Sequence, residues 1–178
     1  LVALDPQASL TLAALDRYDV PTALEAFNGG LIAHLSTPAV WKEYRGSVDI
    51  VPSSRALAQV EGYVDPRVAA ARLINALGDL SEYDIVLIDA PATLNTLTFE
   101  AIALATTVVV VAEPTLFSLR SASDAIAFAL AVRKAKAGFT RKVFIALNKV
   151  DGTEEAAYRV REIKRMFPNL VLKTAIEQ

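Results

Sequence analysis

The sequence of 178 residues contains no cysteine and only one histidine. The absence of cysteine excludes a disulfide framework and is consistent with a reducing, cytoplasmic compartment. One histidine without cysteine excludes the Cys/His clusters of structural zinc sites. There is no G-x-S-x-G segment, which excludes the nucleophile elbow of the α/β-hydrolase class of serine hydrolases. No apolar run approaches the about 18 residues of a membrane span, and no signal peptide is visible, so we expect no membrane association.

A phosphate-binding loop of the form G-x-x-x-x-G-K-[ST] is also missing, because none of the seven glycines is followed by lysine. Leu1 is not a start methionine, and residues 1–4 read as a strand already under way. The last residues, KTAIEQ, look equally unfinished. We therefore expect residues 1–178 to be a single nucleotide-binding domain whose natural chain extends beyond both ends.

Hydrophobic residues make up 53% of the chain and occur in short runs that alternate with longer helical patterns. This alternation predicts βαβ units, and hence an α/β fold with a doubly wound, mostly parallel sheet flanked by helices. The expected strands are residues 1–4, 48–51, 85–88, 108–112, 143–147 and 170–172.

Helix boundaries are expected where capping residues precede a helical pattern. Asp65 and Pro66 open one predicted helix, which Gly78 closes. Ser121 with Asp124 predicts a capping box for a helix that runs to Gly138. Further helices are expected from Asp151, with Glu154, to a stop at Pro168, and short helical patches at 22–27 and 38–44.

Polar side chains follow three of the expected strands. YDIVLIDAP ends in Asp89, and its apolar run predicts a strand buried on both faces. Asp5 begins the segment Asp5-Pro6-Gln7 after the first strand, and Asn148 lies in ALNKVD. Each acid alone is also explained by a turn or a helix cap. Ligands bind at the carboxyl ends of parallel strands, so the three polar residues together predict a nucleotide site. In this site Asp5 would orient the attacking water, Asp89 would hold Mg²⁺ and Asn148 would contact the base.

In order and spacing, these segments resemble the ParA/MinD family of partition and positioning ATPases, which have a P-loop NTPase fold. LVALDPQASL resembles the switch I strand, YDIVLIDAPATLN the Walker B strand with switch II, and VVVVAEPTLFSLRSASDAI the following strand and its proline-containing loop. The resemblance spans nearly the whole chain and is weakest between residues 16 and 61.

The resemblance implies an ATPase that uses ATP and Mg²⁺. It assigns Asp5 to the hydrolytic water, Asp89 to Mg²⁺ through water, and Asn148 to adenine, while Pro114 matches a loop proline near the dimer interface. Two positions depart from the family: Ala3 replaces a common aspartate, and Ala92 a common second proline. The family's phosphate loop precedes the switch I strand by roughly 20 to 30 residues, so we expect it upstream of Leu1.

The resemblance also implies a partition switch in the cytoplasm, associated with the nucleoid. ATP-bound chains would form a homodimer, bind DNA without sequence preference and respond to a ParB-like adaptor or centromere-binding protein. A net charge of −2 requires a local basic patch for DNA contact. The candidates are Lys134, Lys136, Arg141 and Lys142 around Gly138, and Lys164 and Arg165 late in the chain, although such clusters are commonly solvated faces.

Two other functions remain open at this point. NKVD at 148–151 matches the guanine motif of GTP-binding switch proteins, in which the final aspartate bonds the base. That class needs a glycine three residues after the Walker B aspartate, where this chain has Ala92, and Asp151 has an ordinary role as a helix cap. The second is a non-catalytic α/β interaction domain whose strand-end acids bind only a metal or a phosphoryl group.

Overall fold

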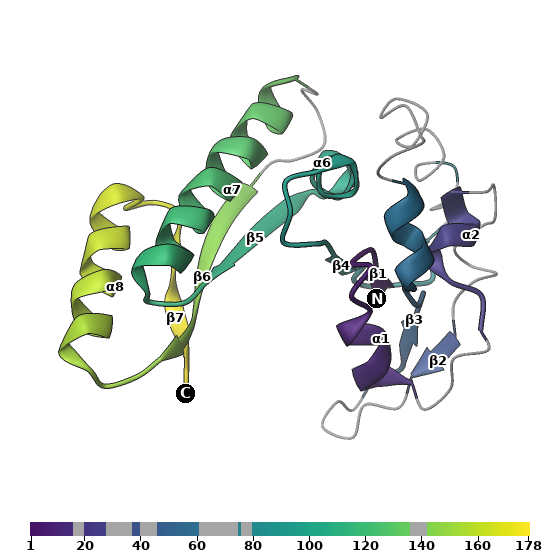
Figure 1. Ribbon diagram of the computed structural model, residues 1–178, viewed down its shortest axis with the longest axis horizontal. Helices are drawn as coiled ribbons and strands as arrows, with labels where there is room; N and C mark the ends of the chain where they lie inside the picture. The colour runs from purple at the N-terminus through teal and green to yellow at the C-terminus, as the bar shows by residue number, and fades with distance from the viewer. Residues whose placement is uncertain (16–19, 28–36, 40–45, 61–74, 76–79, 136–141) are drawn as a thin grey trace. The chain divides into compact units, whose positions relative to one another are not determined.

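The computed structural model of the chain describes residues 1–15, 20–27, 37–39, 46–60, 75, 80–135 and 142–178. It divides into two compact units, Leu1–Ala101 and Ile102–Gln178, and each is described by itself (Figure 1). Parallel strands flanked by helices occur in both, which confirms the predicted α/β class.

The first unit is organised around β1 (Val2–Ala3), which has parallel neighbours on both sides. On one side it pairs with β4 (Ile88–Asp89), and on the other Val2 pairs with Val51, directly after β3 (Val48–Ile50). The amide of Leu4 donates to the carbonyl of Asp89 at 2.8 Å, and the amide of Ala3 to that of Val51 at 3.0 Å. The three segments run in one direction, so their carboxyl ends share one edge.

Short helices follow these strands. They are α1 (Ser9–Ala14), α2 (Ala23–Phe27), the 3₁₀-helix η1 (Arg55–Gln59) and α6 (Thr96–Leu104), whose last residues belong to the second unit. α1 packs Ala14, together with the following Leu15, against Ile50 of β3, which is completely buried. A further strand, β2 (Thr37–Ala39), pairs antiparallel with β3.

The second unit is a parallel three-stranded sheet in the order β5 (Thr107–Ala112), β6 (Lys142–Val150) and β7 (Val171–Glu177). Two helices, α7 (Leu116–Ala135) and α8 (Glu154–Met166), connect the strands and pack on one sheet face (Figure 1). Ile145 and Leu147 of β6 bury there against Ile126 of α7 and Ile163 of α8. Among the described residues no helix has the length and hydropathy of a membrane span.

The strand predicted at 85–88 is wrong in extent and in burial. β4 comprises Ile88 and Asp89 alone, and the side chains of Ile85, Val86 and Leu87 are 73%, 38% and 58% exposed. An apolar run is buried on both faces only where elements cover both faces. Within the described part of the first unit, β4 has β1 as its only strand neighbour and lies at the edge of the sheet.

Two predicted helix starts are also wrong. α7 begins at Leu116 rather than Ser121, because the Thr115 hydroxyl accepts from the Ser118 amide at 3.3 Å at the start of the helix. α8 begins at Glu154 with Thr153 as its N-cap, so Asp151 lies before the cap. The helix ends at Met166, before Pro168 as predicted, with acidic residues in its first turn and basic residues in its last.

The remaining predictions have mixed outcomes. The helical patch at 22–27 corresponds to α2, whereas Pro38 and Ala39 of the patch at 38–44 lie in strand β2, paired with β3. Of the helix predicted at 65–78 the structure describes only Asn75, which is helical. Gly138, the predicted end of α7, is outside the described residues.

Candidate nucleotide site

Asp5 and Asp89 lie at the shared carboxyl edge of the first unit. Asp89 is the last residue of β4 and pairs in register with Ala3 of β1, so Asp5 follows its partner by two residues. β1 therefore carries Asp5 beyond the last paired position, next to the end of β4. The parallel register brings together two carboxylates that are 84 positions apart in the sequence, as the strand-end pattern predicted.

The two carboxylates influence each other electrostatically. Partial burial raises the pKa of Asp89, and the negative charge of Asp5 raises it further. A pair of acids that repel each other in this way favours a cation between or beside them. Among the described residues no group of three or more His, Cys, Asp or Glu side chains could hold a metal alone. The two carboxylates fit Mg²⁺, which binds one or two carboxylates and completes its shell with water and phosphate oxygens.

Asp5 is also part of a tight turn, the alternative that its sequence context left open. Its Oδ1 accepts from the amide of Gln7 at 2.9 Å, and its carbonyl accepts from the amide of Ala8 at 2.9 Å. Ala8 is left-handed, with φ of 58°, and directly precedes α1. The turn fixes the orientation of the Asp5 carboxylate relative to the start of α1, so the structural and the chemical role are compatible.

The segment after Asp89 is tied to the first turn of α6. Asn95 Oδ1 accepts from the amide of Thr98 at 3.1 Å, which makes Asn95 the cap of this helix. The Thr98 hydroxyl lies 2.5 Å from the carbonyl of Thr93 and 3.1 Å from that of Pro91, so one proton is shared between two acceptors. The sequence reading missed this helix, although Asn95 before a helical pattern was an available capping signal.

Pro114 and Asn148 lie in the second unit, at the carboxyl ends of β5 and β6. Ala112, the last residue of β5, pairs with Leu147, and β6 continues beyond this pair to Val150 beside β7. An ion pair joins the two ends, with Lys149 Nζ 2.7 Å from Glu113 Oε1. Lys149 is left-handed, with φ of 53°, at an irregularity in the pairing of β6 with β7. Pro114 is buried and Asn148 is half-buried.

One carboxylate oxygen of Asp151 is hydrogen-bonded within its own turn. Its Oδ1 accepts from the hydroxyl of Thr153 at 2.6 Å and from the amide of Thr153 at 3.1 Å. These hydrogen bonds lower the pKa of Asp151. Thr153 in turn accepts from the amide of Ala156 and caps α8. Asp151 therefore supports the start of α8, by a different contact from the cap that the sequence suggested.

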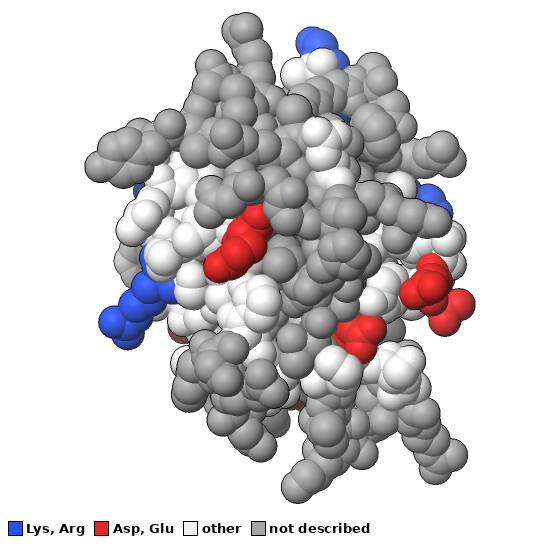
Figure 2. All heavy atoms as spheres, turned by 90° about the vertical axis from the view of Figure 1, so that its right-hand side faces the viewer, with Lys and Arg blue, Asp and Glu red and all other residues white. Residues whose placement is uncertain are grey.

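Four of the six basic candidates fall on described residues, and all four are exposed. Lys134 lies in the last turn of α7, Lys142 begins β6, and Lys164 and Arg165 lie in the last turn of α8. Lys136 and Arg141 are outside the described residues. On the face drawn in Figure 2, charged side chains of the described residues occur separately and form no basic patch.

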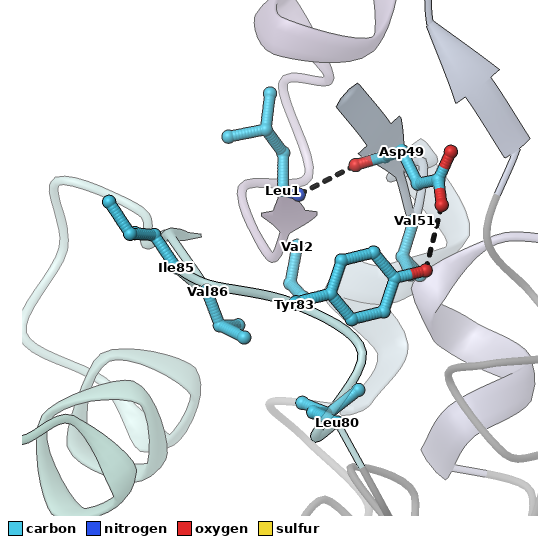
Figure 3. Close-up of a pocket in the computed structure, with 8 residues that line it drawn as sticks. All are labelled: Leu1, Val2, Asp49, Val51, Leu80, Tyr83, Ile85 and Val86. Carbon is cyan, nitrogen blue, oxygen red and sulfur yellow. Dashed lines mark hydrogen bonds between the residues drawn. The ribbon is translucent and has the colours of Figure 1, made fainter. Parts of the chain in front are cut away.

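A pocket in the first unit lies away from the two acids. It is lined by residues at the amino end of β1, by Asp49 and Val51 in and after β3, and by the segment before β4, including Tyr83 (Figure 3). The Tyr83 hydroxyl donates to Asp49 Oδ2 at 2.8 Å across its wall. Because parallel strands end at the opposite edge, the pocket and the acidic pair occupy opposite ends of the strands.

Comparison with known proteins gives a family match and several structural matches. The model of a family described as AAA domain matches residues 1–141. No curated protein is significantly similar to the chain.

Three solved structures are similar over 99% of this chain. A single-residue variant of Cyanothece McdA in complex with ATP has a TM-score of 0.81 at 20% identity, over 71% of its own chain. Cobyrinic acid a,c-diamide synthase from Mycobacterium smegmatis, with an ATP analog and magnesium bound, has a TM-score of 0.80 at 20% identity, over 72% of its chain. A plasmid partition protein from Borrelia burgdorferi has a TM-score of 0.71 at 14% identity, over 76% of its chain. At these identities the similarity establishes the fold.

Proposed function

This chain belongs to the AAA domain family and has the fold of ParA/MinD-type P-loop ATPases, and on that basis we propose that it is an ATP-dependent partition switch. The observation that carries the proposal is the position of Asp5 and Asp89 at the carboxyl ends of adjacent parallel strands, where the charge of Asp5 acts on Asp89. Two mutually repelling carboxylates at this edge suit a site that holds Mg²⁺ and a nucleotide.

Each site residue has a proposed role. Asp89 holds Mg²⁺ through water, Asp5 orients the attacking water, Asn148 reads adenine, and Pro114 belongs to a nucleotide-binding loop near the dimer interface. Bound Mg²⁺ neutralises phosphate charge. The amide of Gln7 keeps the Asp5 carboxylate in one orientation, which suits a group that must meet a water molecule at a fixed place.

Adenine is the proposed base, in preference to guanine. A guanine-reading aspartate at 151 would need its carboxylate oxygens available to the base, whereas Oδ1 of Asp151 already accepts from both the hydroxyl and the amide of Thr153. Ala92 also stands where a GTP switch has glycine. ATP and an ATP analog are the nucleotides in two of the similar structures.

The wider cycle belongs to the same proposal. ATP binding drives homodimerisation, the dimer binds DNA without sequence preference through basic side chains such as Lys164 and Arg165, and an adaptor of the ParB kind stimulates hydrolysis. We place the protein on the nucleoid in the cytoplasm. We also propose that the two units form one nucleotide-binding domain, because the family match to residues 1–141 continues across their boundary at Ala101.

The test uses the full-length protein with Mg²⁺. A fluorescent ATP analog is bound and then displaced by ATP or GTP, and phosphate release is measured separately. ATP should displace the probe at a concentration about tenfold or more below that of GTP. This ratio corresponds to the free energy of one or two hydrogen bonds to the edge of the base. Preferential displacement by GTP would overturn the assignment of adenine as the base. Mg²⁺ binding without any nucleotide binding would favour the alternative function, a non-catalytic α/β interaction domain.

Two substitutions separate the roles. Asp5→Asn should retain nucleotide binding and lower hydrolysis by about 100-fold or more, because a positioned water is lost from the chemical step alone. Asp124→Asn, which removes an exposed acid of α7, is the matched control and should leave both measurements unchanged.

A further inference from the structure

A buried side chain connects the helix after Asp5 with the end of a different strand. Thr11 lies in α1 and is 4% exposed. Its Oγ1 accepts from the amide of Ser53 at 2.8 Å and lies 3.5 Å from the carbonyl of the same residue, to which it donates. Ser53 follows β3 and is also 4% exposed. One hydroxyl therefore satisfies both backbone groups of a buried residue at the same sheet edge as Asp5.

This contact controls where α1 can lie. A helix of six residues is too short to be stable alone, since isolated helices need about 12 to 15 residues, so its position comes from tertiary contacts. The apolar contact of Ala14 and Leu15 with Ile50 holds its last turn. Thr11 adds a directional contact, because a hydrogen bond defines one geometry whereas apolar packing allows small sliding movements.

The position of α1 in turn determines the position of Asp5. Only the turn formed by Pro6, Gln7 and Ala8 separates them, and both the carboxylate and the carbonyl of Asp5 are hydrogen-bonded within that turn. Ala8 holds a left-handed conformation that alanine rarely adopts, so the surrounding contacts must enforce it. If the bond from Thr11 to Ser53 is lost, the turn can relax and carry the Asp5 carboxylate with it.

We propose that Thr11 is a positioning residue for ATP hydrolysis: its bonds to Ser53 fix α1 and thereby hold Asp5 where it meets the attacking water. The proposal rests on the function proposed above. Thr11 acts through Asp5 and touches neither nucleotide nor water. Its loss should therefore slow the chemical step and leave nucleotide affinity nearly unchanged, because a displacement of about 1 Å can cost about 100-fold in rate.

Three variants of the full-length protein test this. Thr11→Val keeps the shape of the side chain and removes the hydroxyl, Thr11→Ser keeps the hydroxyl, and Ile50→Val weakens the apolar packing under α1 without touching either hydrogen bond. For each variant we would measure kcat, the Kd for ATP, and amide hydrogen exchange of residues 7–15 without nucleotide.

Thr11→Val should lower kcat by about tenfold or more, change the Kd for ATP by less than about threefold, and speed amide exchange in residues 7–15. Thr11→Ser should restore kcat to within about threefold of the parent, and Ile50→Val should leave kcat within the same range. An equal fall of kcat in Thr11→Val and Ile50→Val would reduce Thr11 to a stability role and overturn the proposal.

The exchange measurement keeps this inference separate from the proposed function. If the parent protein hydrolyses no ATP, the proposed function is wrong and the role of Thr11 in hydrolysis is wrong with it, while exchange still shows whether the contact fixes α1. If the parent hydrolyses ATP and Thr11→Val exchanges faster at an unchanged kcat, the contact exists but does not position Asp5. Unchanged exchange in Thr11→Val would overturn the contact itself.

Discussion

The carboxylate of Asp89 is perturbed from the neighbouring strand by that of Asp5. Burial raises the pKa of Asp89 first, and the charge of Asp5 adds to the effect. The charge of Asp5 acts on Asp89 because the parallel register of β1 and β4 ends the two strands at one edge of the sheet. The protein thus keeps two acids close together at an energetic cost to the metal-free fold, which a bound cation would offset.

Asp89→Asn should stabilise the metal-free protein at neutral pH and abolish its stabilisation by Mg²⁺. The folded-state pKa of Asp89 lies above its unfolded value, so the folded state binds more protons than the unfolded state between these two pKa values. The free energy of unfolding therefore falls as the pH rises from the unfolded pKa through the raised folded-state pKa. Asparagine carries no charge, so the free energy of unfolding of the variant does not fall in this way as the pH rises. Thermal unfolding at pH 3 and pH 7, with and without Mg²⁺, measures both effects.

The control for that experiment is Asp124→Asn, which should show neither effect. An Asp89→Asn protein that is less stable than its parent at pH 7 without Mg²⁺ would contradict the repulsion between the two acids. An unchanged response to Mg²⁺ would show that Asp89 does not hold the metal.

Thr153→Ala should lower the free energy of unfolding by about 1 kcal/mol, because it removes the side-chain oxygen that accepts from the amide of Ala156 at the start of α8. Ser121→Ala is the informative comparison. The sequence suggested Ser121 as a cap, but it lies inside α7, where alanine is the better helix former. Urea unfolding should show a loss for Thr153→Ala alone, and an equal loss for Ser121→Ala would contradict the observed start of α7.

Lys149→Gly should be more stable than Lys149→Ala by about 1 kcal/mol. Both substitutions remove the ion pair with Glu113, but only glycine adopts the left-handed conformation at this position without steric cost. Since both side chains of the ion pair are about half exposed, its own contribution is small. Thermal unfolding of the two variants measures the difference, and equal midpoints would indicate that residue 149 is not left-handed in solution.

Reversing the charges of Lys164 and Arg165 to glutamate should weaken binding to non-specific DNA by about tenfold or more, and should reduce the slope of log K against log salt by roughly 0.9 for each lost phosphate contact. Both lie exposed in the last turn of α8. Arg159 on the same helix is not a comparable candidate, because Glu162 lies 3.0 Å and Glu155 3.7 Å from its guanidinium.

The matched control reverses Arg120 and Lys173, two exposed basic residues elsewhere in the second unit, and should retain DNA affinity. Fluorescence anisotropy across a salt series distinguishes the two proteins. Equal weakening in both would indicate a general charge effect, and no weakening in either would remove the end of α8 as a DNA contact.

Residues with strong local signals were predicted correctly from the sequence. The cores of β1, β3, β5 and β6 and the adjacency of Asp5 and Asp89 follow from apolar runs and from the common edge of parallel strands, whereas only the first two residues of β7 were predicted. The exposure of residues 85–87 was not predictable, because burial depends on what covers a strand rather than on the strand itself. The contact between Thr11 and Ser53 was also not predictable, because a threonine in a helical pattern gives no indication of a hydrogen-bond partner 42 positions away.

The register between Ala3 and Asp89 also constrains how this sequence can vary among relatives. Exchange among isoleucine, valine and leucine in residues 85–88 leaves both carboxylates in place. A single residue inserted or deleted within β4 would move Asp89 by about 3.3 Å along the strand and turn it to the other face. In an alignment of relatives, the segment from Leu87, whose carbonyl accepts from the amide of Val2, to Asp89 should therefore be free of gaps even where its apolar residues differ.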